Sequence, residues 1–416
     1  MSLADNIEFL KRLPKPGGLG GMAEYARARL PARSPLVEVK QFGTNPGGLR
    51  MFAFVPASLQ RPPALVVVLH GCGQNAAGYD LGAGWSTLAR HCGFALLMPE
   101  QQSSNNANGC FNWFNPEDTA RGQGEAGSIR QMIARMTADH GIDPRRIFVT
   151  GLSAGGAMTS VMLATYPDVF AAGAIIAGLP FGVASNVREA LSGMHGSRAH
   201  SPHDLGEFVR KASHHKGKWP KLSVWHGSVD RVVNPANADE IVKQWLDVHD
   251  LPAAPMSEGI VNGHPHRVWW NADGETVIES YTITNMAHGT PLGLADDDNR
   301  YGTAGAFLIE AGISSSWLIA KFFGLTAWIR ERKVAASKTA PADSPSAKLI
   351  PKVTPIPAPA PIPMPDLSKV LWPLTTLQPR PASAERTPRP ERTPRRAGVD
   401  VGAIITRALT AAGLMK

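Results

Sequence analysis

Residues 146–155 read RIFVTGLSAG, and they are the most informative part of the chain. The apolar and β-branched residues of 146–150 predict a buried strand, and the small residues of 156–164 predict a helix. The two glycines of Gly151-x-Ser153-x-Gly155 permit a strained turn that lifts a serine hydroxyl above the end of the strand. A strand, a sharp G-x-S-x-G turn and a helix together predict that Ser153 is a nucleophile.

Apolar runs alternate with helical stretches on both sides of this turn, which predicts a mostly parallel sheet covered by helices on both faces. Leu65–Leu69 is continuously apolar, as expected for a central strand without a solvent-facing side. The other core elements expected are strands at Phe94–Met98, Ile147–Thr150, Ala172–Ala177 and Leu222–Trp225, and helices at Gly124–Asp139 and Asn237–His249.

Two hairpins and one helix are expected at the ends of this core. Val37–Phe42 and Leu49–Val55 flank Asn45-Pro46-Gly47-Gly48, and His266–Trp270 and Thr276–Thr284 flank a turn that contains Asp273-Gly274. An amphipathic helix at Ser314–Phe323 closes the core. Its expected packing residues are Trp317, Ile319, Ala320 and Phe323.

Composition divides the 416 residues into four parts. We expect an N-terminal arm at 1–35, an α/β catalytic domain at 36–330, a Pro-rich basic linker at 331–398 and an amphipathic helix at 399–416. Within the catalytic domain, 185–220 fits no clean period and is a candidate lid insertion.

The net charge of +8 belongs to the C-terminal tail, because residues 1–330 hold 28 basic and 28 acidic side chains. This distribution argues against nucleic acid as a partner of the catalytic domain. Arg386, Arg389, Arg392, Arg395 and Arg396 precede the expected C-terminal helix. They indicate either a tether for an anionic or apolar surface, or a solvated linker followed by a helix that docks on the core.

Other classes of protein are disfavoured by what the sequence lacks. Three cysteines are too few for a disulfide scaffold, and the histidines between 195 and 215 match no zinc pattern. No phosphate loop or dinucleotide fingerprint appears, so no cofactor or metal is expected. Without an N-terminal apolar segment or an apolar run long enough to span a bilayer, the sequence predicts a cytoplasmic protein with no transmembrane segment.

A serine nucleophile needs a histidine base and a carboxylate that orients the histidine. Asp230 lies in HGSVDRVV (226–233) after the strand at 222–225, and His288 lies in NMAHG (285–289) after the strand at 276–284. The order Ser, Asp, His suits this architecture. We therefore expect Ser153, Asp230 and His288 to form a triad, with a turn or cap aspartate and an ordinary histidine as the alternatives.

An oxyanion is usually stabilised by two backbone N–H groups. The N–H of Ala154 follows the nucleophile, and the N–H of Cys72 lies in His70-Gly71-Cys72-Gly73 after the central strand. Both are expected to form the oxyanion hole. For His70, a structural role below this loop is favoured over contact with the substrate or a role as base.

Trp113 and Phe114 are the candidate substrate-binding aromatics. They lie in a Gly/Asn-rich loop, where a large apolar group is either a platform for the substrate or a packing anchor. The sequence leaves both interpretations open.

Several segments in this order resemble the polyhydroxybutyrate depolymerase family of esterases, which is related to the acetyl xylan and feruloyl esterases. They are LHGCGQNAAGYD (69–80), MPEQ (98–101), NGCFNWFNP (108–116), GLSAGGAM (151–158), TYPDVFAAGAIIAGLP (165–180) and HGSVDRVV (226–233). The resemblance implies an α/β-hydrolase fold and hydrolysis of carboxylic esters by Ser153, Asp230 and His288. It also matches Cys72 and Cys110 to two cysteines of the family, and whether these pair is left open.

The resemblance implies a substrate as well. Hydroxybutyrate oligomers or polymer are the expected substrate, with acetyl xylan or feruloyl esters as the alternative. The segment after His288 lacks the Trp-Pro-Gly-Gly common in secreted members, and the tail is too short and too Pro-rich for a folded polymer-binding domain.

Overall fold

The computed structural model describes residues 34–196, 200–293 and 301–327. Nearly all of the expected N-terminal arm (1–35) lies outside these residues. So do the expected linker at 331–398 and the expected helix at 399–416.

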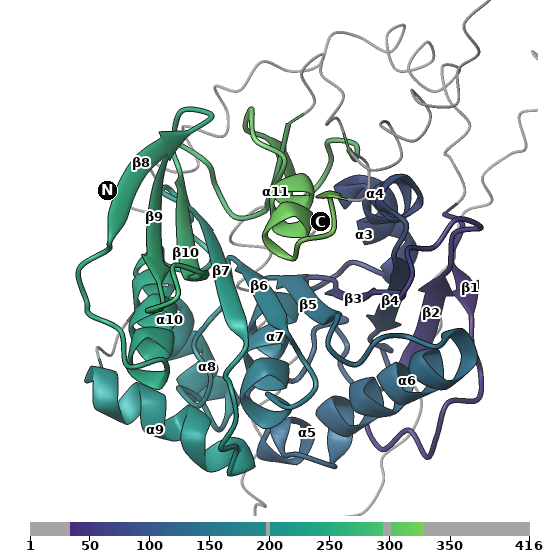
Figure 1. Ribbon diagram of the computed structural model, residues 1–416. Helices are drawn as coiled ribbons and strands as arrows, with labels where there is room; N and C mark the ends of the chain where they lie inside the picture. The colour runs from purple at the N-terminus through teal and green to yellow at the C-terminus, as the bar shows by residue number, and fades with distance from the viewer. Residues whose placement is uncertain (1–33, 197–199, 294–300, 328–416) are drawn as a thin grey trace, which may run out of the picture. The chain divides into compact units, whose positions relative to one another are not determined.

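A ten-stranded sheet runs through the described part of the chain (Figure 1). Its strands, in spatial order, are β1 (Val37–Glu38), β2 (Arg50–Phe54), β4 (Ala95–Glu100), β3 (Leu65–Leu69), β5 (Ile147–Leu152), β6 (Ala172–Ile176), β7 (Lys221–Gly227), β10 (Thr276–Ile283), β9 (His264–Trp270) and β8 (Ser257–Val261). The six strands from β4 to β10 are parallel, and antiparallel strands extend the sheet at both ends. The mostly parallel sheet predicted from the sequence is confirmed.

Strand β3 shows why the central strands are continuously apolar. Leu65, Val67 and Leu69 pack into the core on one face of the sheet, and Val66 and Val68 pack into the core on the other. All five are fully buried. A strand with no solvent-facing side cannot show the alternation of apolar and polar residues that marks a half-exposed strand.

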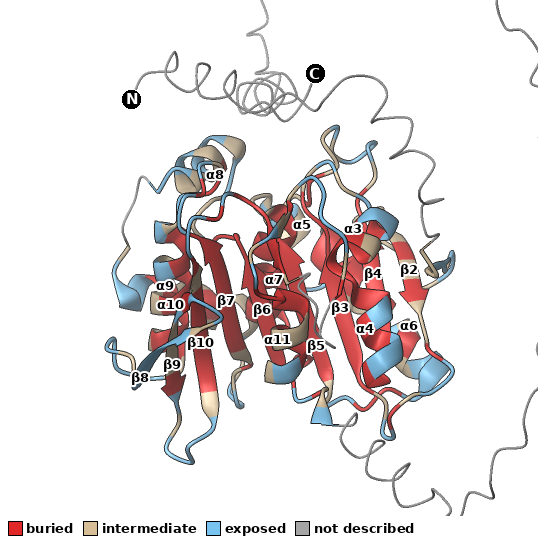
Figure 2. Cartoon of the chain, turned by 90° about the horizontal axis from the view of Figure 1, so that it is seen from above, coloured by how far each residue is buried: buried red, intermediate tan, exposed pale blue. Residues whose placement is uncertain are grey.

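Helices cover both faces of the sheet, as Figure 1 shows. The core on one face contains residues from α6 (Gly124–His140), α7 (Ala154–Thr165), α9 (Pro202–Ser213) and α10 (Ala236–Val248). The core on the other face contains residues from α3 (Ala76–Ala83), α4 (Trp85–Cys92) and α11 (Ser315–Phe322). Figure 2 looks down onto the face of the sheet and shows that its central strands are buried.

The first predicted hairpin is shorter than expected. Strand β1 ends at Glu38, although the sequence predicted a strand to Phe42. Val39 N still donates to the Met51 carbonyl of β2 at 2.8 Å, but the chain from Gln41 to Asn45 is held by α6. Arg135 donates a hydrogen bond to the Gln41 carbonyl, and Gln131 accepts one from the Asn45 amide. Side-chain contacts to a helix thus replace the far end of the ladder that the apolar pattern predicted.

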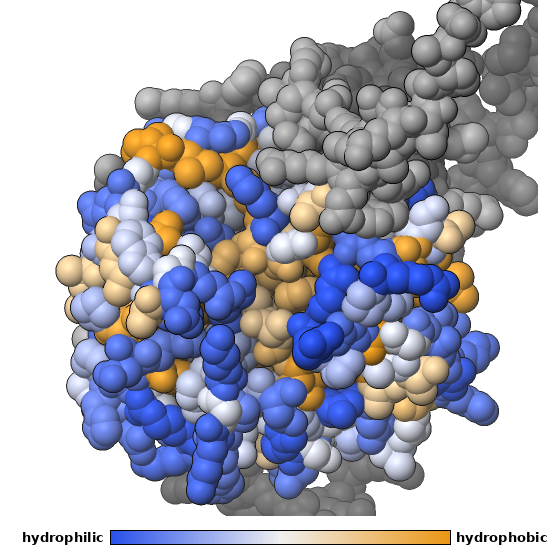
Figure 3. Space-filling view, viewed as in Figure 1, coloured by the Kyte–Doolittle hydropathy of each residue, from blue (hydrophilic) through white to orange (hydrophobic). Residues whose placement is uncertain are grey.

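The second predicted hairpin is present as β9 and β10, joined by a turn in which Asn271 accepts the Gly274 amide. Strand β8 pairs with β9 and was not predicted. It forms the edge of the sheet, and its Ile260 is 68% exposed. Figure 3 shows apolar surface at this end of the molecule, at the upper left. The mainly exposed sequence of β8 explains why an apolar pattern could not reveal it.

The candidate lid at 185–220 consists of two helices, with residues 197–199 between them outside the described part. Helix α8 (Val187–Met194) is capped by the Asn186 side chain, and α9 is capped by Ser201, whose side chain accepts from Asp204 N. Helix α9 contacts α7 and α10 and buries Leu205 and Val209, so it belongs to the helical layer. Only the α8 part remains a candidate lid.

Helix α11 confirms the predicted closing helix. Ile319, Ala320 and Phe323 are buried against the sheet, and Trp317 is partly buried beside them. The Ser314 side chain caps the helix. Of the helices in the described residues, none combines the length and apolar character needed to cross a membrane.

A small two-stranded sheet and a short helix complete the described elements. The sheet pairs β11 (Thr290–Leu292) with β12 (Leu308–Glu310) in parallel, and the helix is α5 (Pro116–Thr119). Strand β11 begins two residues after His288. The two-stranded sheet therefore holds in place the chain that follows His288.

Candidate active site

Ser153 occupies the turn between β5 and α7. Its backbone angles are φ 58° and ψ −118°, a strained conformation for a residue with a side chain. The turn is close-packed, because a Cβ added to Gly151 would lie 2.3 Å from the Gly155 carbonyl oxygen, and one added to Gly155 would lie 2.3 Å from the Leu69 oxygen. The two glycines of the motif therefore allow the backbone to close under the serine.

Asp230 lies in the loop that follows β7. Its Oδ1 accepts hydrogen bonds from the amides of Val232 and Val233, at 2.8 and 2.9 Å. Its Oδ2 accepts from His288 Nδ1 at 2.7 Å. Burial alone would raise the pKa of this carboxyl, but hydrogen bonds from His226 and His288 and their charges outweigh it and hold the pKa well below its ordinary value. Asp230 is therefore an anion suited to orienting an imidazole.

His288 follows β10 and is 7% exposed. Its loop is fixed to the Asp230 loop, since Ser228 N donates to the Ile283 carbonyl and Val229 N donates to the Met286 carbonyl. When Nδ1 carries the proton that it donates to Asp230, Nε2 is left as the basic nitrogen. This is the tautomer that a general base requires.

The three predicted catalytic residues lie at one edge of the sheet. Ser153, Asp230 and His288 follow the carboxyl ends of β5, β7 and β10, and these strands are parallel to one another through β6. The structure brings Asp230 and His288 into contact, but no hydrogen bond joins Ser153 to His288, both of which are described residues. In hydrolases this bond is often long before substrate binds.

His226, the last-but-one residue of β7, is a site residue that sequence reasoning missed. Its Nε2 lies 3.3 Å from Asp230 Oδ2 and 2.9 Å from the Val233 carbonyl oxygen. It is 2% exposed. The only signal in the sequence was its position four residues before Asp230 in HGSVD.

The two expected oxyanion-hole donors lie in different environments. Ala154 is the first residue of α7, where backbone N–H groups have no partner within the helix and favour negative charge. Cys72 lies in the turn after β3, in which Gln74 N donates to the Gly71 carbonyl and Gly71 N donates to Gln74 Oε1. Cys72 is joined to Cys110 by a disulfide. This answers the question that the sequence left open.

His70 is buried and both its ring nitrogens are used inside the protein. Nδ1 donates to the Gly71 carbonyl at 2.8 Å, and Nε2 accepts from the Gln101 amide at 3.1 Å. Burial lowers the pKa of the ring, so it is neutral. The structural role is therefore the better supported of the two interpretations, and neither ring nitrogen is left for a substrate.

Trp113 and Phe114 meet edge to face with ring centroids 5.5 Å apart. Trp113 packs against the main core and against a small apolar cluster near the catalytic loops, formed by Ala157, Leu179 and Val233. Met194 of α8 packs on the same cluster. Trp113 thus serves as a packing anchor, and one side of it lies close to α7, the helix that follows Ser153.

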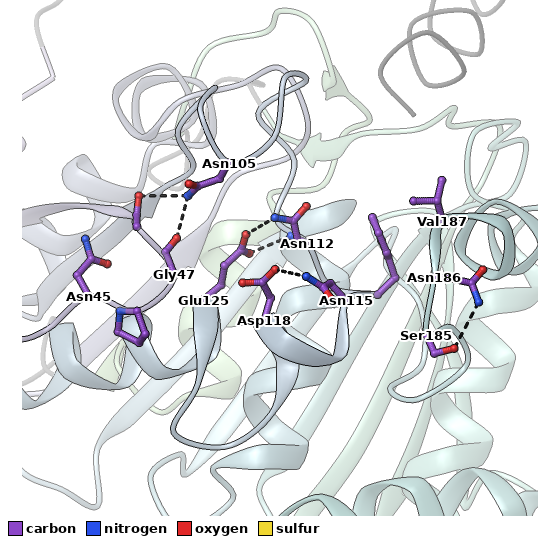
Figure 4. A pocket seen from close by; sticks show the side chains of 13 residues that line it. Asn45, Gly47, Asn105, Asn112, Asn115, Asp118, Glu125, Ser185, Asn186 and Val187 are labelled. Carbon is purple, nitrogen blue, oxygen red and sulfur yellow. Dashed lines mark hydrogen bonds between the residues drawn. The ribbon is translucent and has the colours of Figure 1, made fainter. Parts of the chain in front are cut away.

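Phe114 lines a pocket of about 650 Å³ (Figure 4). Polar side chains from the turn at 45–48, the loop at 105–118 and the start of α8 surround it. Its amides are committed to the protein itself. Asn105 donates to Gly47 and Gly48, Asn112 donates to Glu125, and Asn115 donates to Asp118. The hydrogen bonds around this pocket therefore hold the loop at 105–118 in place.

No group of three or more His, Cys, Asp or Glu side chains suited to a metal ion occurs in the described residues. Of the histidines between 195 and 215, His195 and His200 lie between α8 and α9, His203 lies in α9, and His214 and His215 follow α9. His195 bonds to the Leu191 carbonyl of α8, and His215 bonds to the Lys218 carbonyl.

The chain is similar in sequence to several known proteins. A family model described as Esterase PHB depolymerase matches residues 50–257. Poly(3-hydroxyalkanoate) depolymerase C of Paucimonas lemoignei is 47% identical over 291 residues, which are 70% of each chain. An acetylxylan esterase of Coprinopsis cinerea is 31% identical, covering 62% of this chain and 69% of that one.

Among solved structures, an acetyl xylan esterase from Aspergillus awamori is similar, with a TM-score of 0.60 and 25% sequence identity. The match covers 70% of this chain and 99% of the other. The shared architecture is the α/β-hydrolase fold, as the sequence predicted.

Proposed function

The chain belongs to the PHB depolymerase family of esterases and is a carboxylic ester hydrolase, and from this premise we propose that Ser153, His288 and Asp230 carry out the hydrolysis. The contact that supports this most directly is the 2.7 Å hydrogen bond between His288 and Asp230. It lies at the sheet edge where the strained Ser153 turn also lies.

In the proposed reaction, Ser153 Oγ attacks the ester carbonyl carbon while His288 Nε2 takes the hydroxyl proton. Asp230 stabilises the imidazolium that forms. The negative charge on the carbonyl oxygen is held by the amides of Cys72 and Ala154. The C–O bond then breaks, the alcohol leaves with the proton from His288, and an acyl group remains on Ser153.

Water completes the cycle. His288 takes a proton from the water as its oxygen attacks the acyl carbon, and the same two amides hold the second oxyanion. The bond to Ser153 breaks, the serine regains its proton and the carboxylic acid leaves. Every step uses the chain's own residues.

We propose poly(3-hydroxyalkanoate) chains or their oligomers as the substrate class. The support is the 47% identity to a poly(3-hydroxyalkanoate) depolymerase, against 31% to an acetylxylan esterase and 30% to feruloyl esterase B of Talaromyces stipitatus. Acetylated xylan or feruloyl esters are the alternative, favoured by the structural likeness to an acetyl xylan esterase.

A panel of esters tests both proposals. It contains p-nitrophenyl butyrate, a 3-hydroxybutyrate trimer, amorphous polymer, acetylated xylan and methyl ferulate. We expect the trimer and polymer to be cleaved with the highest kcat/KM and Ser153→Ala to abolish turnover of every ester. If acetylated xylan is the only ester cleaved, the alternative substrate class is the correct one. Activity that survives in Ser153→Ala would refute the triad.

The basic tail supports a second proposal, a tether to the polyester granule or to an anionic surface. Its five arginines between 386 and 396 precede the apolar segment 399–416. Deletion of 335–416 is expected to leave hydrolysis of soluble esters unchanged and to abolish sedimentation with granules or anionic vesicles. Equal sedimentation of both proteins would mean that the tail is only a linker.

A further inference from the structure

Gln101, the last residue of the MPEQ segment, directly follows β4 and is 6% exposed. Its backbone N–H donates to His70 Nε2 at 3.1 Å. Its side-chain Nε2 donates to the Cys110 carbonyl at 3.0 Å and to Glu125 Oε1 at 2.5 Å. Its Oε1 accepts from two groups in 102–105. One residue therefore connects a strand end, a long loop and a buried carboxyl.

Glu125 lies in the first turn of α6 and is fully buried. Besides Gln101, it accepts hydrogen bonds from Asn112 Nδ2 at 2.8 Å and from Asn112 N at 2.9 Å, as Figure 4 shows for Asn112. Burial, aided by the nearby charge of Asp118, raises the pKa of this carboxyl to about 8. Burying a carboxyl group costs folding free energy unless it is hydrogen-bonded. Its three hydrogen bonds fix the loop on a helix that belongs to the core.

This network reaches the expected oxyanion loop by two routes. Through the first route, Gln101 N bonds to His70, whose other nitrogen donates to the Gly71 carbonyl, next to Cys72. Through the second, the Gln101 side chain holds the Cys110 carbonyl, and Cys110 is disulfide-bonded to Cys72. Gln101 thus fixes both the residue before Cys72 and the cysteine bonded to it.

We propose that Gln101 and Glu125 are positioning residues that fix the Cys72 amide where it can stabilise the oxyanion. The inference rests on the proposed function, because it takes the Cys72 N–H as an oxyanion donor. Such a donor acts only when it is preorganised at hydrogen-bond distance from the charged oxygen. The disulfide limits how far the loop can move, and the hydrogen bonds fix the direction of its amides.

Gln101→Met tests the inference, because methionine keeps the approximate size and removes the side-chain hydrogen bonds. The full-length protein is assayed with p-nitrophenyl butyrate and with a trifluoromethyl ketone, which forms a tetrahedral oxyanion on the serine. We expect kcat to fall roughly 10- to 100-fold with little change in KM. The inhibition constant of the ketone should rise by a similar factor.

Gln244→Met is the matched control. Gln244 is also buried and also fully bonded, since its side chain accepts from Phe181 N and donates to the Phe181 and Leu205 carbonyls. None of these hydrogen bonds involves residues 70–74. We expect Gln244→Met to lower the melting temperature while kcat stays within about threefold of the parent. Equal losses of kcat in both variants would reduce the effect to general destabilisation and overturn the inference.

Two changes at Glu125 test whether it acts through Gln101. Glu125→Gln keeps an oxygen for Gln101 and should retain most of kcat, whereas Glu125→Met removes it and should lose kcat as Gln101→Met does. The double variant Gln101→Met/Glu125→Met should lose no more than the larger single loss. If the double variant loses kcat by the product of the two single losses, the inference is wrong. It is also wrong if Gln101→Met has an unchanged kcat while Ser153→Ala is inactive. Both results would leave the proposed function intact. Activity in Ser153→Ala would overturn the proposed function instead.

Discussion

The Nε2 of His226 lies 3.3 Å from Oδ2 of Asp230, the same oxygen that accepts a hydrogen bond from His288. Because Nε2 also lies 2.9 Å from the Val233 carbonyl oxygen, it must carry a proton to bond there. His226 is therefore a donor shared by the aspartate and its own loop. It limits the orientations in which Asp230 can hold His288.

Two substitutions separate this role of His226 from simple packing. Gln places an amide N–H near the position of Nε2, whereas Leu fills similar space without a donor. We expect His226→Leu to lower kcat roughly 10- to 100-fold and His226→Gln to recover much of that loss. Both are measured with p-nitrophenyl butyrate. If the two variants lose kcat equally, His226 contributes only volume.

Gly155→Ala tests the close packing under Ser153. The added Cβ would lie 2.3 Å from the Leu69 carbonyl oxygen and 2.5 Å from the His70 carbonyl oxygen, so the backbone must shift. We expect the unfolding free energy to drop by several kcal/mol and kcat to fall by about two orders of magnitude or more, since the shift displaces the nucleophile. Urea unfolding and ester kinetics measure the two effects. Gly259→Ala in the edge strand, where no atom lies within 4 Å of the added Cβ, is the control.

The parts of the fold that the sequence predicted are those with a strong local pattern. The run LVVVL identified β3 because both its faces are buried, and the Ser153 turn was recognisable because glycines are needed at two fixed positions. Asp230 and His288 were predicted because each follows a core strand. Strand β8 was missed because its residues are mostly exposed, and helix α8 was missed because it is only eight residues long and buries only Ala190.

The residues that support the site, such as Gln101 and His226, could not be predicted from the sequence for another reason. Gln101 contacts His70, 31 residues away, and Glu125, 24 residues away. Hydrogen bonds between such distant residues leave no periodic signal, and a glutamine or glutamate looks like any other polar residue. MPEQ and HGSVD are visible as motifs, but only the folded chain shows which partners Gln101 and His226 contact.

The buried carboxyl of Glu125 makes stability depend on pH. Its pKa is raised from 4.5 to about 8, so the folded protein holds this proton more tightly than the unfolded chain does. The stabilisation is complete below pH 4.5 and is lost as the pH rises to about 8, with a slope of at most about 1.4 kcal/mol per pH unit. Glu125→Gln should flatten this part of the curve. The unfolding free energy in urea, measured from about pH 5 to about pH 9 for both proteins, provides the comparison.

Asp230 affects the pH dependence of stability in the opposite direction, because its pKa is lowered in the folded state. Burial opposes this shift, and the hydrogen bonds from His226 and His288 prevail. Its contribution to stability is present above the unfolded pKa of 3.8 and is lost as the pH falls below it. Asp230→Asn should therefore reduce acid sensitivity, while lowering kcat roughly 10⁴-fold because the amide no longer selects the right tautomer of His288. A variant with normal kcat would contradict the proposed triad.

The disulfide between Cys72 and Cys110 supplies the last prediction. It closes a loop of 38 residues, and restricting the unfolded chain to such a loop is worth about 4 kcal/mol in the chain-entropy treatment. We expect Cys72→Ser/Cys110→Ser to lose ~2–4 kcal/mol of unfolding free energy and kcat to fall only a few-fold, because the Gln101 backbone N–H still holds His70, which bonds to the Gly71 carbonyl next to residue 72.

Combining the serine pair with Gln101→Met then removes both restraints on the Cys72 loop. The Gln101 side chain reaches Cys72 through the Cys110 carbonyl and the disulfide, so the two restraints act along one path. The triple variant should therefore lose less kcat than the product of the two separate losses, and the shortfall is the coupling between them. The two losses should simply multiply if the restraints act on different parts of the loop. Kinetics on the four proteins at one temperature, chosen so that all remain folded by circular dichroism, distinguish these outcomes.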